Sequence, residues 1–180
     1  MGEIKAVIPV KLIVGQIASD PELFYASQRE LVSRYGEVDF ESPVLDFTFT
    51  DYYRPEMGEG LKRRFIAFKE LIEPPELAGA KLFTQEIEAR LGEVGEGKLK
   101  RRINLDPGYL NLGKLVLAST KDHQHRLYIK DGIFAEVTLR YRGGTYAPWE
   151  WTYPDYQSPA YLEIFHQIRE IFREQLKNRL

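Results

Sequence analysis

The stretch Lys100-Arg101-Arg102-Ile103-Asn104-Leu105-Asp106-Pro107-Gly108-Tyr109 decides the fold that this sequence predicts. Residues 101–105 are typical of a short strand that begins with basic side chains. Asp106-Pro107-Gly108 fits a helix N-cap followed by proline in the first turn, which predicts a helix over residues 107–120. A second basic triplet, Lys62-Arg63-Arg64, opens another predicted strand. Both triplets are therefore expected at the starting ends of strands.

Hydrophobic periodicity predicts five further elements ahead of this stretch. The expected elements are strands over 4–17, 44–52 and 63–72 and helices over 21–35 and 74–91, with a glycine-rich loop over 92–97. Together with the strand at 101–105, their order is β-α-β-β-α-β. That is the order of a ferredoxin-like fold.

The remainder of the chain is expected to add a helix, an antiparallel β-meander and a last helix. Asp131-Gly132 and Gly143-Gly144 are typical of two-residue hairpin turns. After Ser158-Pro159, apolar residues recur at helical spacing and predict an amphipathic C-terminal helix. The predicted fold class is α+β in a single domain, 1–180. A ferredoxin-like βαββαβ half (1–105) is followed by the helix, the meander and the C-terminal helix packed on it (106–180).

The composition excludes several classes of protein. With 180 residues, of which 43% are hydrophobic and 29% charged, the chain can bury a sizeable core. A net charge of −2 argues against a general nucleic-acid coat, so an anion site must be local. The absence of cysteine excludes disulfides, thiolate zinc sites and cysteine nucleophiles. No apolar run approaches the roughly 20 residues of a membrane span, so the cytoplasm is the expected location. The many Glu, Lys and Arg residues are typical of thermophilic proteins.

The two basic triplets predict an anion site. In a ferredoxin-like sheet the spatial strand order is 4-1-3-2, so the third and fourth strands begin beside the end of the first. The triplets would then surround Gly15 and Gln16. Because side chains alternate faces along a strand, about half of the cations could converge on one anion. The alternative, that these cations pair with nearby carboxylates at a solvated sheet end, stays open. The residues assigned to binding here are Lys62, Arg64, Arg102, Asn104 and Tyr109.

Hairpin geometry predicts a second candidate surface on the meander. Two-residue turns place Glu136 opposite Leu127 and Trp151, and Arg140 opposite Ala147. Aromatic and polar side chains that share one face are typical of a ligand platform, although a bulge would shift the register and a helix could cover the face. The face would carry His125, Glu136, Thr138, Arg140, Trp149, Trp151 and Tyr153.

This face supplies the candidates for chemistry. His125 and Glu136 are the acid–base candidates, and Arg140 is the charge-stabilising candidate. His123 and His125 have a spacing that can hold a metal, but two ligands do not make a site, so neither metal nor cofactor is assigned. Trp149, Trp151, Tyr153 and Asp155 are assigned to ligand binding.

Several common signatures are absent from the sequence. No Gly-x-x-x-x-Gly-Lys-Ser/Thr loop exists, which excludes a P-loop GTPase even though Thr120-Lys121-Asp122 resembles a guanine-reading motif. No Gly-x-Gly-x-x-Gly follows the first strand, which excludes a Rossmann dinucleotide site. Gly-x-Ser-x-Gly and His-Glu-x-x-His, the commonest hydrolase and metalloprotease signatures, are absent as well.

Longer strings carry a resemblance to a known family. They are Arg102-Ile103-Asn104-Leu105-Asp106-Pro107-Gly108-Tyr109-Leu110, Leu117-Ala118-Ser119-Thr120-Lys121-Asp122, Gly132-Ile133-Phe134-Ala135-Glu136-Val137-Thr138-Leu139, Trp151-Thr152-Tyr153-Pro154-Asp155-Tyr156, and a Thr-Asp-Tyr-Tyr segment followed by Met-Gly at 50–58. The chain resembles, end to end, a bacterial and archaeal domain-of-unknown-function family, number 4416 in that series. The resemblance implies no activity, substrate or catalytic residue.

The favoured function is the binding of an anionic small molecule, phosphorylated or carboxylated, with a nucleotide as one example. The basic sheet edge would take the anion, and the Trp149/Trp151 face would take a planar or apolar part. One alternative is an enzyme that uses the His/Glu pair of the meander. Another is a module that contacts RNA or a protein partner through the sheet edge.

Overall fold

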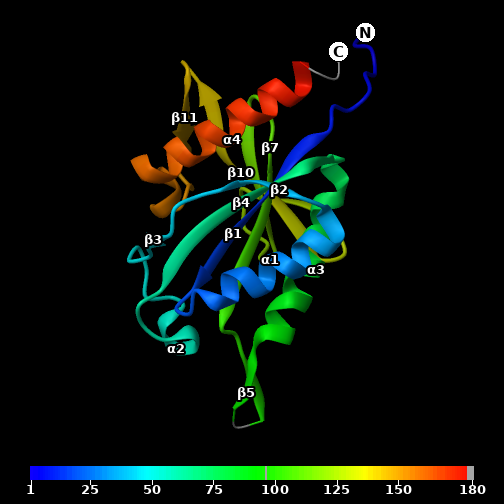
Figure 1. Ribbon diagram of the computed structural model, residues 1–180. Helices are drawn as coiled ribbons and strands as arrows, with labels where there is room; N and C mark the ends of the chain where they lie inside the picture. Colours follow the sequence, from blue (N-terminus) through cyan, green and yellow to red (C-terminus); the bar gives the residue numbers. More distant parts are fainter. Residues whose placement is uncertain (96, 178–180) are drawn as a thin grey trace.

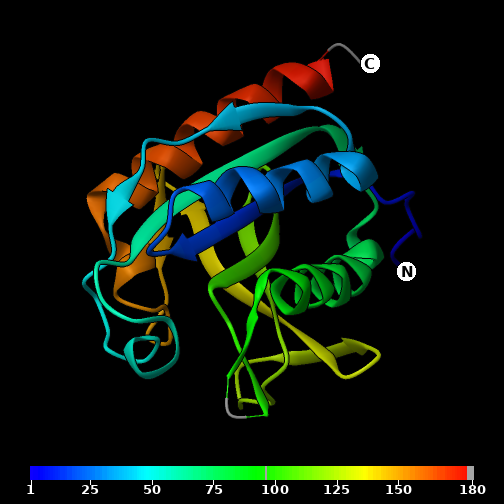
Figure 2. The ribbon, with the colours of Figure 1, turned by 60° about the horizontal axis from the view of Figure 1, so that its bottom comes forward.

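The chain is built around one long antiparallel sheet, which a computed structural model describes over residues 1–95 and 97–177 (Figure 1). Its strands are β1 (Val10–Ala18), β2 (Val38–Glu41), β3 (Leu45–Asp46), β4 (Lys62–Ile72), β7 (Ile103–Leu110), β8 (Lys114–Ser119), β9 (Leu127–Lys130), β10 (Ile133–Arg142) and β11 (Thr145–Pro148). The helices are α1 (Glu22–Tyr35), α2 (Arg54–Met57), α3 (Leu77–Leu91) and α4 (Pro159–Lys177), with 3-10 turns η1 (Pro74–Glu76) and η2 (Asp155–Gln157). A separate hairpin of β5 (Glu93–Gly95) and β6 (Lys98–Lys100) projects from the body (Figure 2).

The strands follow the order β11-β10-β8-β7-β1-β4-β2, with β3 added to β4 and β9 added to β10. Ala18 at the end of β1 pairs with Lys62 at the start of β4 and with Ile103 at the start of β7. The two basic triplets therefore lie at the same end of the central strands, on either side of β1. The fold is a mixed α and β architecture with antiparallel pairing.

Helices α1 and α3 cover one face of the central strands. Leu12 and Val14 of β1 and Ile66 of β4 point to this face and pack with Phe24 of α1 and Ile87 of α3. Helix α1 ends at Gly36, whose φ of 80° is unfavourable for residues with a side chain. Both helices were predicted within a few residues of these bounds.

Helix α4 crosses the opposite face (Figure 1). Its apolar stripe, which includes Phe165, Ile168 and Phe172, packs on Ile13 of β1 and Phe65 of β4 in a second core cluster. The predicted amphipathic C-terminal helix is confirmed. Since α4 occupies only part of this face, the starting ends of β4 and β7 remain available for a pocket.

The helix predicted over residues 107–120 is wrong. This segment is the hairpin of β7 and β8, and Pro107 lies in the strand opposite Val14. A Cβ at Gly108 would lie 2.5 Å from the carbonyl oxygen of Val116, so glycine permits the close approach of the two strands. Asp106 is consequently a strand residue, not a helix N-cap. Local sequence suited both structures, and pairing with β1 and β8 overrode the local preference.

Three other predicted elements need correction. The strand expected over 4–17 begins only at Val10, and residues 1–8 are exposed. The strand expected over 44–52 is reduced to β3, because Phe47 turns away from the sheet into a small cluster with Ile17 and Met57. The loop expected over 92–97 contains β5 and the turn to β6, apart from residue 96, which lies outside the described residues.

Both predicted hairpin turns of the meander are confirmed. Asp131 and Gly132 have φ values of 51° and 78°, and Gly143 and Gly144 have 62° and 84°. Two consecutive positive φ values are typical of the type I′ turn that suits the twist of a two-stranded ribbon.

The predicted strand register of the meander is confirmed between β10 and β11 but not between β9 and β10. Arg140 pairs with Ala147, as predicted. Leu127 pairs with Ala135 instead of Glu136, because the register shifts between Ile133 and Phe134. The predicted partner Trp151 lies beyond the end of β11 at Pro148 and forms no strand pair with Glu136.

Within the described part of the chain, no helix is long and apolar enough to cross a membrane.

Candidate functional site

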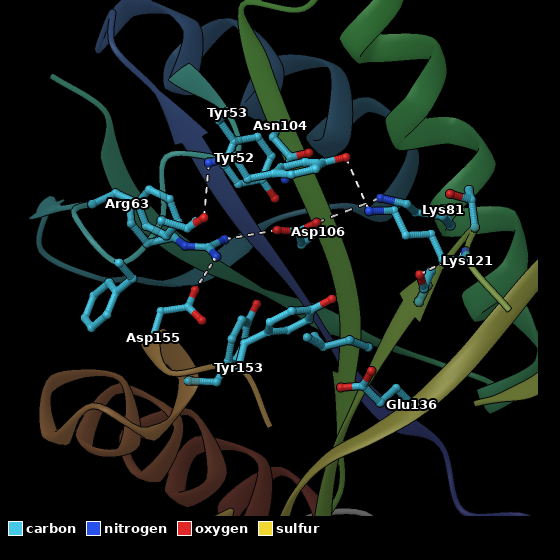
Figure 3. A pocket seen from close by; sticks show the side chains of 18 of the residues that line it. Tyr52, Tyr53, Arg63, Lys81, Asn104, Asp106, Lys121, Glu136, Tyr153 and Asp155 are labelled. Carbon is cyan, nitrogen blue, oxygen red and sulfur yellow. Dashed lines mark hydrogen bonds and ion pairs between the residues drawn. The ribbon is translucent and has the colours of Figure 1, made fainter. Parts of the chain in front are cut away.

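A pocket opens where β7 and β8 part (Figure 3). These strands pair only at Gly108–Leu110 with Leu115–Leu117. The first half of β7 continues along β1, and the end of β8 continues along β10, so a gap widens between them. The gap, closed at one side by α3, holds a cavity of about 530 Å³. That volume lies within the range of small-molecule sites.

The walls of the pocket combine charge with aromatic rings. Its cations are Arg63, Lys81, Arg101, Lys121 and Arg126, and its carboxylates are Glu88, Asp106, Glu136 and Asp155. Its rings are Phe47, Phe49, Tyr52, Tyr53, Tyr153 and Tyr156. Five cations face four carboxylates, so the lining carries a formal charge of +1.

Arg63 and Glu136 are the most deeply buried charges of the pocket, each with 2% of its surface exposed. Arg63 Nη1 lies 3.2 Å from Asp106 Oδ2 and its Nη2 lies 3.1 Å from Asp155 Oδ2, while Nε donates to Tyr161 Oη at 3.3 Å (Figure 3). Burial alone would lower the pKa of Arg63, but the neighbouring tyrosines and the two aspartates outweigh it and hold the pKa well above its usual value. Arg63 therefore stays charged and fixes both aspartates.

Glycine at position 15 makes room for this guanidinium. Gly15 lies on β1 between Phe65 of β4 and Asp106 of β7. A Cβ at Gly15 would lie 2.7 Å from Arg63 Nη1 and 3.0 Å from the ring of Phe65. Arg63 can therefore reach across β1 to Asp106 only because position 15 has no side chain.

Two lysines lie on the other side of the pocket: Lys81 has one carboxylate within 4 Å, and Lys121 has none among the described residues. Lys81 Nζ donates to the carbonyl of Leu105 at 2.9 Å and lies 3.9 Å from Asp106 Oδ1. Lys121 Nζ donates to Tyr52 Oη at 3.3 Å and lies 4.6 Å from the centre of that ring. Among the described residues, Lys121 forms no ion pair. Figure 3 shows both lysines across the pocket from Arg63. The only ion pair that the described residues give to either lysine is the 3.9 Å contact of Lys81 with Asp106.

Two buried polar groups in the lining have no hydrogen-bond partner among the described residues. They are Asn104 Nδ2 and Tyr156 Oη, on side chains that are 4% and 3% exposed. Asn104 Oδ1, in contrast, accepts a bond from Arg101 Nη1 at 3.0 Å. A buried donor without an acceptor costs about 1–3 kcal/mol, so such groups in a pocket point to an acceptor supplied by a ligand.

Glu88 places a protonatable carboxyl in the same pocket. It is 6% exposed, and its Oε1 accepts the backbone N–H of Leu105 at 2.6 Å. Burial raises the pKa of Glu88, and the neighbouring Lys81 opposes that rise. A buried acid with a raised pKa in a pocket is a candidate for proton exchange with a bound molecule.

The loop 47–61 forms one wall of the pocket and is fastened by an ion pair. Glu56 Oε2 accepts hydrogen bonds from Arg101 Nε at 2.9 Å and Arg101 Nη2 at 2.6 Å. This hydrogen bonding lowers the pKa of Glu56. Gly58 and Gly60, with φ values of 80° and 68°, end the loop. The pair holds Tyr52 and Tyr53 over the pocket.

The cations assigned from sequence lie outside the pocket. Lys62 is exposed and bonds to Asp46. Arg64 points to the α1 face, where its Nε donates to Gln16 Oε1 at 2.8 Å. Arg102 Nη2 lies 3.4 Å from Asp20 Oδ2. The contacts of these three residues are those of the alternative interpretation, in which the cations bond to nearby side chains of the protein itself.

The other assigned ligand residues divide between pocket and core. Asn104, Tyr153 and Asp155 line the pocket. Tyr109 packs against the cores beneath α3, where burial raises its pKa.

Several residues predicted to share one face of the meander do lie together, and their side chains form a stacked column. The ring centres of Trp149 and Trp151 are 5.1 Å apart, and His125 stacks on Trp151 at 5.4 Å. The guanidinium of Arg140 lies 4.1 Å from the ring centre of Trp149. His125 Nε2 is 3.0 Å from Glu136 Oε2. Of this column and its carboxylate, only Glu136 lines the pocket.

Sequence reasoning missed the cations that do line the pocket. Arg63 was within the first triplet, but the assignment chose its neighbours on the other face of the strand. Lys81 lies on a predicted helix, and the spacing of apolar residues in that helix did not indicate a pocket. Lys121 and Arg126 follow the end of β8, which was expected to be helical. The alternation that groups Arg63 with Phe65 was the one available signal.

No group of three or more His, Cys, Asp or Glu side chains within residues 1–95 and 97–177 is arranged to hold a metal ion.

Comparison with known proteins gives one result. A family model described as "Domain of unknown function (DUF4416)" matches residues 8–172. No curated protein matches the chain. No solved structure matches it either.

Proposed function

The chain belongs to the DUF4416 family, which carries no activity with it, and we propose from the pocket that the protein binds an anionic small molecule, phosphorylated or carboxylated. A nucleotide is one member of that class. The observation that carries the proposal is that one pocket contains both lysines with little or no carboxylate contact and buried hydrogen-bond donors that lack acceptors. Lys81 and Lys121 supply the charge, and Asn104 and Tyr156 supply the donors.

The ligand is expected to be rich in acceptor oxygens. Lysine and amide N–H groups donate, so phosphate or carboxylate oxygens satisfy them together. Three of the four carboxylates of the lining are already paired, because Arg63 contacts Asp106 and Asp155, and Arg126 Nε bonds to Glu136 at 2.8 Å. The fourth, Glu88, has a pKa raised by burial, which favours its uncharged form. An anion therefore meets the lysine side of the pocket.

A thermal-shift measurement at low ionic strength tests this proposal. The probes are inorganic phosphate, ribose 5-phosphate and citrate, with uncharged ribose as the control. A ligand that binds only the folded state raises Tm, and the stabilisation grows with the logarithm of one plus its concentration over Kd. We expect at least one anion to raise Tm while ribose does not. Equal Tm values with all four probes would contradict anion binding.

A catalytic role is a second candidate, favoured by the contact between His125 and Glu136 at 3.0 Å. Glu136 reaches the pocket, and His125 could exchange protons through it. Release of phosphate from p-nitrophenyl phosphate, lost in His125→Gln, would support an enzyme. Absence of release in the wild-type protein would leave binding as the function. Arg140 is placed too far into the stacked column to act in this pocket.

The strand order also supports the finer description of the fold. The order β7-β1-β4-β2, with α1 and α3 on one face, is what a ferredoxin-like half would give. Because the same sheet continues through β8 and β10, we infer a single domain.

A further inference from the structure

The mouth of the pocket gathers exposed aromatic rings. Phe49, Tyr52 and Tyr153 are 43%, 58% and 48% exposed, and all three line the pocket. Among the described residues, only two other aromatic side chains, Tyr25 and Tyr128, are exposed to this degree. Exposed rings concentrated at one cavity mark a binding surface rather than scattered surface residues.

Two of these rings lie on opposite sides of the opening. Tyr52 comes from the loop after β3, and Tyr153 comes from the turn before η2. Figure 3 shows them facing the cavity from opposite sides, with Asp106 between them in the view. Tyr153 is also fixed in place, because Arg126 Nη2 donates to its hydroxyl at 3.2 Å. A flat group could enter between the two rings.

The ring site and the cation site are adjacent. Lys121 Nζ lies 4.6 Å from the centre of the Tyr52 ring and 3.3 Å from its hydroxyl. Ser119 and Thr120, which precede Lys121 in the chain, also line the pocket. A ligand that touches Tyr52 with a ring therefore needs only a short linker to bring an anion to Lys121.

We propose that the pocket selects anions that carry a planar ring, with the ring between Tyr52 and Tyr153 and a phosphate at Lys121. This inference rests on the proposed anion binding and names the class of ligand. Base–aromatic stacking is worth roughly 1–3 kcal/mol per base, which corresponds to about 5- to 150-fold in Kd.

Isothermal titration calorimetry with matched probes tests this class. AMP and GMP carry a planar base, and ribose 5-phosphate, which has the sugar and the phosphate but no base, is the comparison. We expect at least one ring-bearing probe to bind about tenfold tighter than ribose 5-phosphate. In Tyr52→Leu and in Tyr153→Leu this advantage should fall towards unity. Tyr153 forms no hydrogen bond to Lys121 among the described residues, so in Tyr153→Leu the affinity for ribose 5-phosphate should stay within about twofold, whereas Tyr52→Leu also removes a partner of Lys121. Tyr128→Leu, which removes an exposed ring from β9, is the control and should retain the advantage.

The outcomes separate the two proposals. Equal affinities of the wild-type protein for the nucleotides and for ribose 5-phosphate would overturn selection for a planar ring and leave anion binding intact. A ring advantage that survives both Tyr52→Leu and Tyr153→Leu would also overturn it. If no phosphate binds at all, the anion site itself fails, and ring selection fails with it.

Discussion

Arg63 Nη1 on β4 lies 3.2 Å from Asp106 Oδ2 on β7, although β1 separates the two strands in the sheet. The contact passes over Gly15 of β1, where a Cβ would lie 2.7 Å from Arg63 Nη1. This bridge ties the two strands whose starting ends frame the pocket. It also removes Asp106 from competition with an incoming anion.

Substitution of Gly15 by alanine should strain this bridge. The new Cβ would lie 2.7 Å from Arg63 Nη1 and 3.0 Å from Phe65, and overpacking of this kind costs about 1–3 kcal/mol. Urea denaturation should therefore show a lower free energy of unfolding for Gly15→Ala. Gly113→Ala is the control, because its Cβ would meet no atom closer than 3.7 Å. Equal loss in both variants would show that the space at Gly15 has no special role.

Removal of the buried Arg63 should lower the free energy of unfolding far more than removal of its neighbour Lys62. Arg63→Met leaves Asp106 and Asp155 without their shared partner, and breaking a buried pair costs about 3–5 kcal/mol. Lys62→Met breaks only an exposed pair with Asp46 and should change stability by less than about 0.5 kcal/mol. Chemical denaturation of the two variants measures the difference. Similar values would contradict the role given to Arg63.

Glu88 should make stability fall as pH rises. Burial raises its pKa in the folded state above the ordinary value of 4.5, so the folded protein binds more protons than the unfolded chain in the interval above 4.5. The contribution of Glu88 to stability is therefore fully present below pH 4.5 and lost as pH rises through the raised pKa. Glu88→Gln should become more stable relative to wild type over that interval, as followed by denaturation at several pH values. The exposed Glu86→Gln on the same helix should show no such trend.

The tryptophan column should contribute to stability rather than to ligand binding. Trp151 stacks on Trp149 and His125, and its Nε1 donates to the carbonyl of Val137 at 3.1 Å. Trp151→Leu should lower the free energy of unfolding by about 1–3 kcal/mol. At a temperature where the variant is folded, its affinity for ribose 5-phosphate should match that of wild type. A selective loss of affinity would restore the Trp face as a ligand surface.

The sequence predicted the elements whose signals are local. Helices α1, α3 and α4 carry apolar stripes, and α1 has proline near its start and glycine after its end. The two type I′ turns carry glycine where φ is positive. These features depend on residues only a few positions apart, so a single sequence reveals them.

The pocket depends on tertiary choices that the sequence left open. Asp106-Pro107-Gly108 suits a helix start as well as a strand, and only pairing with β1 and β8 selects the strand. That error displaced Lys121 and hid the gap between β7 and β8. Lys62 and Arg64, which were assigned to binding, do not line the pocket, because alternation groups residues by face but does not say which face is hollow. Asn104 and Asp155 were assigned through neighbouring motifs and do line the pocket.

The most direct test of anion binding is the affinity of Lys121→Ala for ribose 5-phosphate, measured by calorimetry beside wild type and Lys130→Ala. Lys121 is exposed and forms no ion pair within the described chain, so its removal should leave the free energy of unfolding within about 0.5 kcal/mol of wild type. A charge-assisted hydrogen bond is worth about 1.5–3 kcal/mol, so we expect Lys121→Ala to bind about tenfold more weakly or worse. Lys130→Ala, on the exposed strand β9, should bind as wild type does. Equal affinities in all three proteins would contradict the placement of the anion at Lys121.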